Sequence, residues 1–535
     1  MGADETLRVI DSRWRDTCKV LLKGDVGPIS DYSEWLTRDI IPINHRKSET
    51  SGKQVVSAPT DYADGSKWIS FDEVDFGKKF VPLGINEIKD IDSLVEALSE
   101  RFYYTGNIVF GKSSHIENSS NINDSHYIYE IGRTGNSKYL AYCRMGRLCE
   151  DCFGCDAIGE SSYCIRCNRC FKNTRCFETW MSQHCSDCHF SYGLINCKNC
   201  LFSFNVRNRV RNIGNLELEQ SKFLSIREKL LSEMREELEK NKKLPSIIEL
   251  VGRGKDEKLE TPKIGQMEIK HSEPKQDKSK IESEFAKTYS TLFGRKPNGG
   301  IDDYSEWLIR HTRPTLERVS AMSGRKLILA PHAQYANLPK DRLLSSEEAE
   351  AFGKSVKLDA SEVEALSMKN AHEKINKLAF FDIEMADGAN DNIIDCAIYA
   401  DSVNCYKSSV TVYTKNCAYS FWPRSCQYLF GCDSPFDSTF CINCYSCTQL
   451  SRCFEIDCCG YCSDLYFGHN CENVHQSMFC FNMKNRRNCI GNAEYSKEDY
   501  GRIRGSLLSQ IADELEKSKD FKLDIYNIGS RIGSR

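Results

Sequence analysis

Of the residue types in this chain, cysteine can take part in the most kinds of chemistry. The spacing of the cysteines indicates which of these roles is favoured. The sequence holds 28 cysteines in 535 residues. Runs such as Cys164, Cys167 and Cys170 have the C-x-x-C spacing of structural zinc sites. Cysteines can also act as nucleophiles, form disulfides or ligate iron–sulfur clusters. The pattern along the whole chain favours one of these uses over the others.

Twenty-six of the 28 cysteines fall on two grids with a three-residue spacing. An α-helix repeats every 3.6 residues and a strand every 2, so neither explains the grid. Cys18 and Cys458 lie off it. Read every twelve residues, the columns stay small or apolar, as in Leu140, Cys152, Cys164, Cys176, Cys188 and Cys200.

These columns predict a mainly β fold with flanking helices, built on a narrow β-solenoid of about twelve residues per turn. Four short sides of three residues would each direct one side chain inward, and like residues would stack along the axis. Adjacent turns would lie about 4.8 Å apart. The pattern is similar to the turn of an insect antifreeze β-helix, without the threonine rows of that family.

The chain is also a tandem duplication. The hexapeptide at 31–36 returns at 303–308, and 140–215 aligns with 417–492 without a gap. Each copy is predicted to hold a leading segment, a cysteine solenoid and a closing amphipathic helix, with a charged flexible linker between the copies. The predicted boundaries are 1–251 for the first copy (leading segment 1–109, solenoid 110–215, helix 216–245), 252–281 for the linker, and 282–535 for the second copy (leading segment 282–390, solenoid 391–494, helix 495–520).

The duplication helps to separate the uses of cysteine. Seven cysteines match between the copies, whereas others are replaced, as Cys152 is by Leu429 and Cys197 by Val474. Leucine and valine cannot ligate zinc but can fill the same interior place, so we expect packed free thiols and no cofactor. Zinc at some matched positions is the alternative: Cys149, Cys155, Cys164, Cys167, Cys170, Cys176, Cys185, Cys426, Cys432, Cys441, Cys444, Cys447, Cys453 and Cys462. Disulfides and an iron–sulfur cluster are less favoured, because the expected compartment is reducing and the usual four-cysteine runs are missing.

Composition sets further limits. The net charge of −4 gives no general bias toward nucleic acid or membranes. No run of 18 apolar residues predicts a transmembrane helix, and the first residues lack the apolar core of a signal peptide. We therefore expect an intracellular, cytoplasmic protein, or a virion protein if the chain is viral. No P-loop, GxSxG, HExxH or dinucleotide fingerprint occurs, so no catalytic residue is predicted.

Two features are predicted as partner surfaces. Trp35 and Trp307, from the repeated hexapeptide, could anchor a protein partner or could pack their own helix. Basic residues near the solenoid ends could meet phosphate or carboxylate groups, or could simply discourage end-to-end stacking. They are Arg207, Arg209, Arg211, Lys484, Arg486 and Arg487.

The end of the second solenoid carries a family resemblance. Residues 479–492 end in Cys489-Ile-Gly-Asn492, and Tyr495-Ser-Lys-Glu-Asp-Tyr500 follows. This looks like a group of cysteine-rich repeat proteins of large phages, other large viruses and candidate-phylum bacteria. Many of those are described as CaiB/BaiF-like, but nothing here resembles a CoA-transferase. The resemblance covers about 390–505 well and 110–215 more loosely, and it implies a solenoid and a viral setting.

We therefore expect a non-enzymatic structural or scaffolding protein, a virion or assembly component that presents rigid solenoid faces to other proteins. The alternative is an intracellular zinc-binding adaptor that contacts nucleic acid or a ribonucleoprotein through the basic solenoid ends. A chelator would unfold the adaptor and salt would weaken its nucleic-acid binding.

Overall fold

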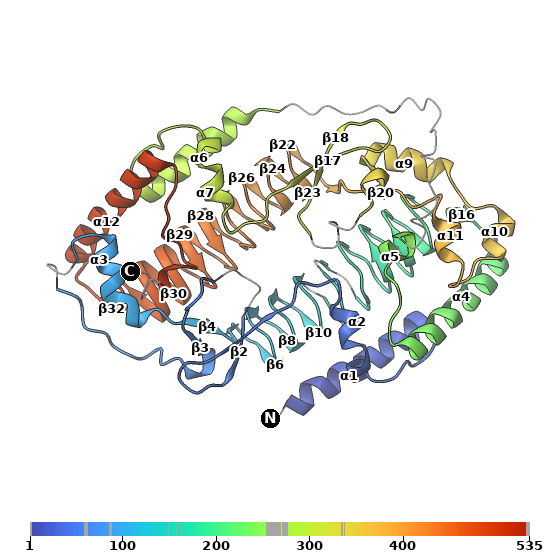
Figure 1. The fold of residues 1–535 in the computed structure, drawn as a ribbon, viewed down its shortest axis with the longest axis horizontal. Coiled ribbons are helices and arrows are strands. Elements are labelled where there is room, and N and C mark those ends of the chain that lie inside the picture. The colour runs from blue at the N-terminus through green and yellow to red at the C-terminus, as the bar shows by residue number, and fades with distance from the viewer. Residues whose placement is uncertain are drawn as a thin grey trace. The chain divides into compact units, whose positions relative to one another are not determined.

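A computed structural model describes residues 3–57, 62–84, 88–147, 149–156, 158–160, 162–252, 269, 276–332, 335 and 338–530. The chain is mainly β with interspersed helices (Figure 1), as the spacing of the cysteine columns predicts. The predicted linker at 252–281 lies mostly outside the described residues. Its last residues belong to helix α6 (Lys278–Phe293), so the predicted linker is too long at that end.

Strand pairing repeats every twelve residues. Cys405 of β24 (Val403–Tyr406) lies opposite Cys417 of β26 (Lys415–Ala418) in a parallel pair. In the first copy, Ile128 lies opposite Leu140 in the same way. We call the parallel-paired stretches 109–213 and 386–490 the first and second ladders. Figure 1 shows the strands of each ladder stacked in sequence order.

The corners of the ladders are made by residues in the left-handed region, which recur every third position. Asn404, Lys407 and Val410, for example, have φ values of 54°, 42° and 56°. In the cysteine columns the corner residue precedes an inward one, as Asn404 precedes Cys405. Asparagine tolerates this conformation better than other non-glycine residues, and it occupies many of the corners.

The compact units are not contiguous copies of the repeat. Unit 1 comprises Met1–Ile43, Val109–Ser272 and Glu317–Met385, and unit 2 comprises Asn44–Ile108, Glu273–Leu316 and Ala386–Arg535. Each ladder is therefore completed by part of the other copy's leading segment. We call 44–108 and 317–385 the exchanged segments. This arrangement differs from the predicted contiguous division at 251 and 282.

In unit 1, helices and the second exchanged segment pack against the first ladder. Helix α1 packs on three strands of the ladder and against α4. Its helices are α1 (Ala3–Leu22), α2 (Ser33–Thr37), α4 (Gln220–Asn241), α5 (Ile247–Gly252), α9 (Ser346–Ser355), α10 (Ala360–Glu364) and α11 (Ala371–Ile375). Its strands are β5 (Val109–Phe110), β6 (Ser114–Glu117), β7 (Ile122–Asn123), β8 (His126–Tyr129), β9 (Thr134–Gly135), β10 (Lys138–Ala141), β11 (Gly146–Arg147), β12 (Phe177–Trp180), β13 (His189–Tyr192), β14 (Lys198–Leu201), β15 (Val210–Ile213), β16 (Leu216–Glu217), β17 (Leu316–Val319), β18 (Lys326–Leu329), β19 (Leu343–Leu344) and β20 (Phe381–Asp382).

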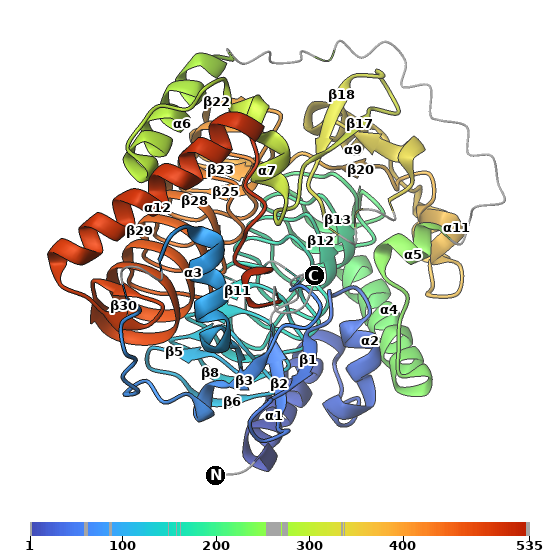
Figure 2. The same ribbon diagram turned by 60° about the vertical axis from the view of Figure 1, so that its left-hand side comes forward.

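Unit 2 repeats this plan with the second ladder. Helix α6 packs along five of its strands and against α12, and α3 lies beside the last turns of the ladder (Figures 1 and 2). Its helices are α3 (Ile91–Leu98), α6, α7 (Ser305–Ile309) and α12 (Lys497–Ser518). The remaining strands are β1 (Asn44–Lys47), β2 (Gln54–Ser57), β3 (Trp68–Ser70), β4 (Tyr104–Gly106), β21 (Ala386–Asp387), β22 (Asp391–Ile394), β23 (Ala397–Ala400), β25 (Ser409–Val412), β27 (Gln427–Phe430), β28 (Thr439–Tyr445), β29 (Ser451–Asp457), β30 (Ser463–Arg487), β31 (Cys489–Ile490) and β32 (Ala493–Glu494).

The repeated Ile-Gly-Asn motif ends each ladder. The Asn492 side chain accepts the N–H of Phe481 at 2.9 Å and donates to its carbonyl at 2.6 Å. Asn215 makes the same pair with Phe204, at 2.8 and 3.0 Å. The amide therefore bonds the backbone as a further strand would, and it satisfies groups that an open edge leaves unpaired.

Candidate functional site

The grid cysteines form two buried cores, which we call the first and second cysteine cores. Isoleucine, leucine and valine contribute to both cores, and Met483 to the second. The first contains Cys143, Cys149, Cys152, Cys155, Cys164, Cys167, Cys170, Cys176, Cys185, Cys188, Cys197 and Cys200. The second contains Cys405, Cys417, Cys426, Cys432, Cys441, Cys444, Cys447, Cys453, Cys459, Cys462, Cys471, Cys480 and Cys489, with Cys396 partly buried against it.

The thiols do more than fill space. The S–H of Cys459 donates to the carbonyl of Asp457 at 3.3 Å, and its sulfur accepts the N–H of Cys471, one turn later, at 3.2 Å. Ser182 makes the equivalent pair, donating to the Trp180 carbonyl at 2.8 Å and accepting the Leu194 N–H at 3.0 Å. At these two positions the inward residue supplies an acceptor to a buried N–H. Cysteine supplies it while filling more volume than serine.

Burial favours the protonated form of many of these thiols, whereas hydrogen bonds from neighbouring cysteines lower the pKa of Cys197 and Cys441. Burial raises the pKa of the Cys155, Cys167, Cys459 and Cys480 thiols well above the ordinary value. Nucleophilic attack and metal ligation both require the thiolate. This environment suits a packed thiol better than a reactive one.

All fourteen predicted zinc ligands lie in the two cysteine cores. Over the described part of the chain, however, the group of three ligand atoms that come within 4.8 Å of one another is Asp457, Cys458 and His469, in unit 2. None of these was predicted. Cys458 is one of the two cysteines that lie off the grids. Asp457 and His469 are twelve residues apart, and this spacing indicates that they stack on successive turns of the ladder.

The Asp457 cluster is a buried hydrogen-bonded network. Its carboxylate accepts from the Tyr62 hydroxyl at 2.5 Å and from His469 Nδ1 at 2.9 Å, and Cys458 Sγ lies 3.1 Å from its other oxygen. On the far side of the ring, His469 Nε2 accepts the backbone N–H of Thr105 at 2.7 Å. Asp457 and His469 come from the second ladder, and Tyr62 and Thr105 come from the first exchanged segment.

These bonds decide how the histidine is protonated. An N–H donor at Nε2 means that this nitrogen carries no proton, so the proton of the neutral ring is on Nδ1, where it is donated to Asp457. Both ring nitrogens are then engaged in hydrogen bonds within unit 2. The cluster therefore joins the second ladder to the first exchanged segment.

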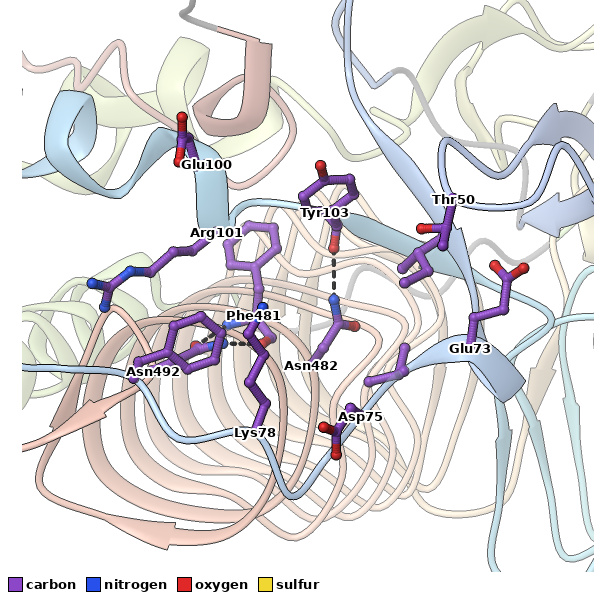
Figure 3. A pocket seen from close by; sticks show the side chains of 13 residues that line it. Thr50, Glu73, Asp75, Lys78, Glu100, Arg101, Tyr103, Phe481, Asn482 and Asn492 are labelled. Carbon is purple, nitrogen blue, oxygen red and sulfur yellow. Dashed lines mark hydrogen bonds between the residues drawn. The ribbon is translucent and has the colours of Figure 1, made fainter.

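A cleft of about 300 Å³ lies in unit 2 between the last ladder turn and the first exchanged segment (Figure 3). Asn482 donates across it to the Tyr103 carbonyl at 2.8 Å. Arg101 donates to the Gly491 carbonyl at 2.6 Å, and Lys78 lies over the Phe80 ring. Several lining side chains therefore hold the exchanged segment in place.

The predicted partner anchors are used inside the units. Trp35 and Trp307 are 2% and 1% exposed, so they are not surface anchors in this structure. The Trp35 indole N–H donates to the Leu244 carbonyl at 2.9 Å. Their burial is explained by the alternative prediction, that each tryptophan packs its own helix onto the unit.

Most of the predicted basic residues have partners in their own unit. Arg207 pairs with Glu350 at 3.1 Å, and Lys484 pairs with Glu472 at 2.7 Å. The other contacts are Arg209 with Glu217, Arg486 with Glu494, and Arg211 with the Leu218 carbonyl. Arg487 is exposed. These ends are therefore of mixed charge, which weakens the case for binding phosphate there.

Comparisons of the chain with protein-family models, with curated proteins and with solved structures give no match. Among the helices that the structure describes, none is both long and apolar enough to cross a membrane.

Proposed function

We propose that the chain is a non-enzymatic scaffolding protein built on two narrow β-solenoids, whose rigid faces bind other proteins of a larger assembly. The observation that carries this proposal is the twelve-residue parallel register, which stacks cysteine on cysteine in the two cysteine cores. Because those interiors are filled and internally hydrogen-bonded, the side chains left to meet a partner are on the outside.

One outer row of the second ladder is suited to this role. Its residues stand at corner positions twelve apart, so about 4.8 Å separates neighbours along the row. All are exposed, and two are tyrosines that are 44% and 36% exposed. The row consists of Tyr413, Ser425, Asp437, Gln449, Tyr461, Asn473 and Asn485. A regular, uncharged to weakly acidic surface with aromatic side chains fits protein partners better than nucleic acid.

The setting that we propose is a virion or its assembly. The support is the resemblance of the end of the second copy to repeat proteins of large phages and viruses. A scaffold also accounts for the duplication, since two tethered faces bind a multivalent target more tightly than one.

Sedimentation from the protein's source would test the proposal. We expect the tagged chain to run with a large assembly rather than as a 61.1 kDa species, and to stay there after nuclease or chelator treatment. Replacing Tyr413 and Tyr461 by serine should release it, whereas Gln449→Ser, in the same row, should not.

Two results would overturn the scaffold. A chain that always runs alone has no assembly to support. Release by nuclease or chelator would favour the zinc-binding adaptor, and native mass spectrometry would then show whole zinc masses that are lost on denaturation.

A further inference from the structure

The structure assigns a partner to each half of the chain, and that partner is a second copy of the same repeat. We propose that the repeat is a pairing module that completes its ladder with the exchanged segment of another copy. The present chain would then be two such modules, fused by the linker but held together by exchange. This inference does not depend on the scaffolding role.

In unit 2, the first exchanged segment makes backbone contacts with the last ladder turns. Thr105 N–H donates to His469, and Asn482 donates to the Tyr103 carbonyl, at 2.7 and 2.8 Å. The Tyr104 hydroxyl donates to the carbonyl of Ile525 at 2.7 Å. Tyr104 is fully buried, so these contacts lie inside the unit and not on its surface.

Unit 1 repeats these contacts with the copies reversed. Asn205, the counterpart of Asn482, donates to the Phe380 carbonyl at 2.7 Å, and Phe380 is the counterpart of Tyr103. Tyr192, the counterpart of His469, donates to the Asp382 carbonyl at 2.8 Å. Because both units use equivalent positions, the exchange is reciprocal.

The glycine of the Ile-Gly-Asn motif is part of the same surface. Gly491 and Gly214 both have φ of +57°, which favours glycine. A Cβ at Gly491 would lie 2.1 Å from Leu98, and one at Gly214 would lie 2.4 Å from Leu358. The two leucines come from the two exchanged segments and are fully buried. The motif therefore both caps the ladder and accepts a leucine from the other copy.

A half without its partner would lose this covering. The second ladder would expose Phe481 and the Asn482 amide, and the polar groups of the Asp457 cluster would lose Thr105 and Tyr62. Exposed apolar surface and unpaired buried groups both disfavour that state. A second copy supplies the matching leucine, carbonyl and N–H groups.

Cleavage of the full chain tests the proposal. A specific protease site placed between residues 252 and 276 would cut the linker after folding. We expect the two fragments to remain a 1:1 complex in native mass spectrometry and to separate only in denaturant. Two compact fragments of half mass, each alone in native buffer, would overturn the proposal.

A zero-length cross-link gives an answer even if the cut protein precipitates. Lys222 of the first half forms an ion pair with Glu364 of the second exchanged segment. Carbodiimide treatment of the uncut chain should join these two residues, and Lys222→Gln should abolish that product. A link from Lys222 to Glu96, the counterpart of Glu364 in its own half, would show an unexchanged fold instead.

Discussion

A buried glutamate stands at matched positions of the two ladders, and its hydrogen-bond partners differ between the two units. In unit 1, Glu178 forms an ion pair with Arg166, which also pairs with Asp39. In unit 2, the counterpart Glu455 accepts from the side chain of Asn443, which replaces the arginine, at 2.9 Å. All of these side chains except Asp39 are at most 2% exposed. At matched positions of the two units, the glutamate is therefore paired with a cation in one unit and with a neutral amide in the other.

The difference shows in the acidity of the two carboxyl groups. Burial raises the pKa of Glu178 to about 7, against the opposing effect of Arg166. Burial and the nearby Asp524 raise the pKa of Glu455 to about 8. At neutral pH, Glu455 is therefore mostly a neutral acid. The two matched carboxyl groups therefore differ more in their partners than in their pKa.

The largest expected effect is a loss of unit 2 stability as pH rises. The pKa of Glu455 is about 8 in the folded chain, against an ordinary value of 4.5. Between these values the unfolded chain releases the proton and the folded chain keeps it, so the free energy of unfolding falls with rising pH and levels off above about 8. At about 1.4 kcal/mol per pKa unit, the fall is on the order of 5 kcal/mol.

The matched variants are Glu455→Gln and Glu178→Gln. Each should flatten the pH dependence of its own unit, and the window for Glu178 should close near pH 7, where its pKa lies. Urea unfolding, followed by a short alkylating pulse and mass spectrometry, reads each cysteine core separately. If Glu455→Gln leaves the pH dependence of unit 2 unchanged, the neutral-acid account is wrong.

The stacking of the cysteine columns could be predicted from the sequence alone. A spacing of three residues per side and twelve per turn places equivalent residues in line, and Cys405 pairs with Cys417 as the columns require. The left-handed corners had a signal that was missed, since asparagine precedes cysteine at Asn199, Asn404 and Asn416. Asparagine at a regular spacing is typical of positive φ.

The exchange of segments could not be read from the sequence. Both leading segments carry leucines, and the sequence does not indicate which of them packs on which ladder. The Asp457 cluster was missed for a related reason. Asp457 and His469 are on the outer side of the ladder, and the first exchanged segment buries them.

A second test removes the cation from the charged site. Arg166→Met would remove the cation that Glu178 and Asp39 share, which costs about 3 to 5 kcal/mol for a buried pair. Asn443→Leu, at the matched position, breaks a neutral hydrogen bond and should cost about 1 to 3 kcal/mol. Alkylation of each core in urea measures both. Equal losses of stability in the two units would mean that the ion pair of Arg166 contributes no more than the hydrogen bond of Asn443.

A third test asks whether cysteine and serine are equivalent at matched inward positions. Cys459→Ser copies Ser182 of the first ladder and keeps an acceptor for the Cys471 N–H, so its main cost is lost volume, about 1 kcal/mol. Cys459→Val fills the volume but removes the acceptor, which should cost about 1 to 3 kcal/mol. Hydrogen exchange at Cys471 should speed up in the valine variant alone. If the serine variant is the less stable of the two, volume matters more than the hydrogen bond.

The smallest effect is expected where the two units are alike. Arg175 bonds both oxygens of Asp187, one turn away, and Arg452 does the same with Asp464. The arginine side chains are 41% and 43% exposed, so water screens both pairs. Replacing either arginine by alanine should cost about 0.2 to 1 kcal/mol, with the same value in both units and less in high salt. An unequal cost would mean that the two units differ in their surface ion pairs as well as at their buried glutamates.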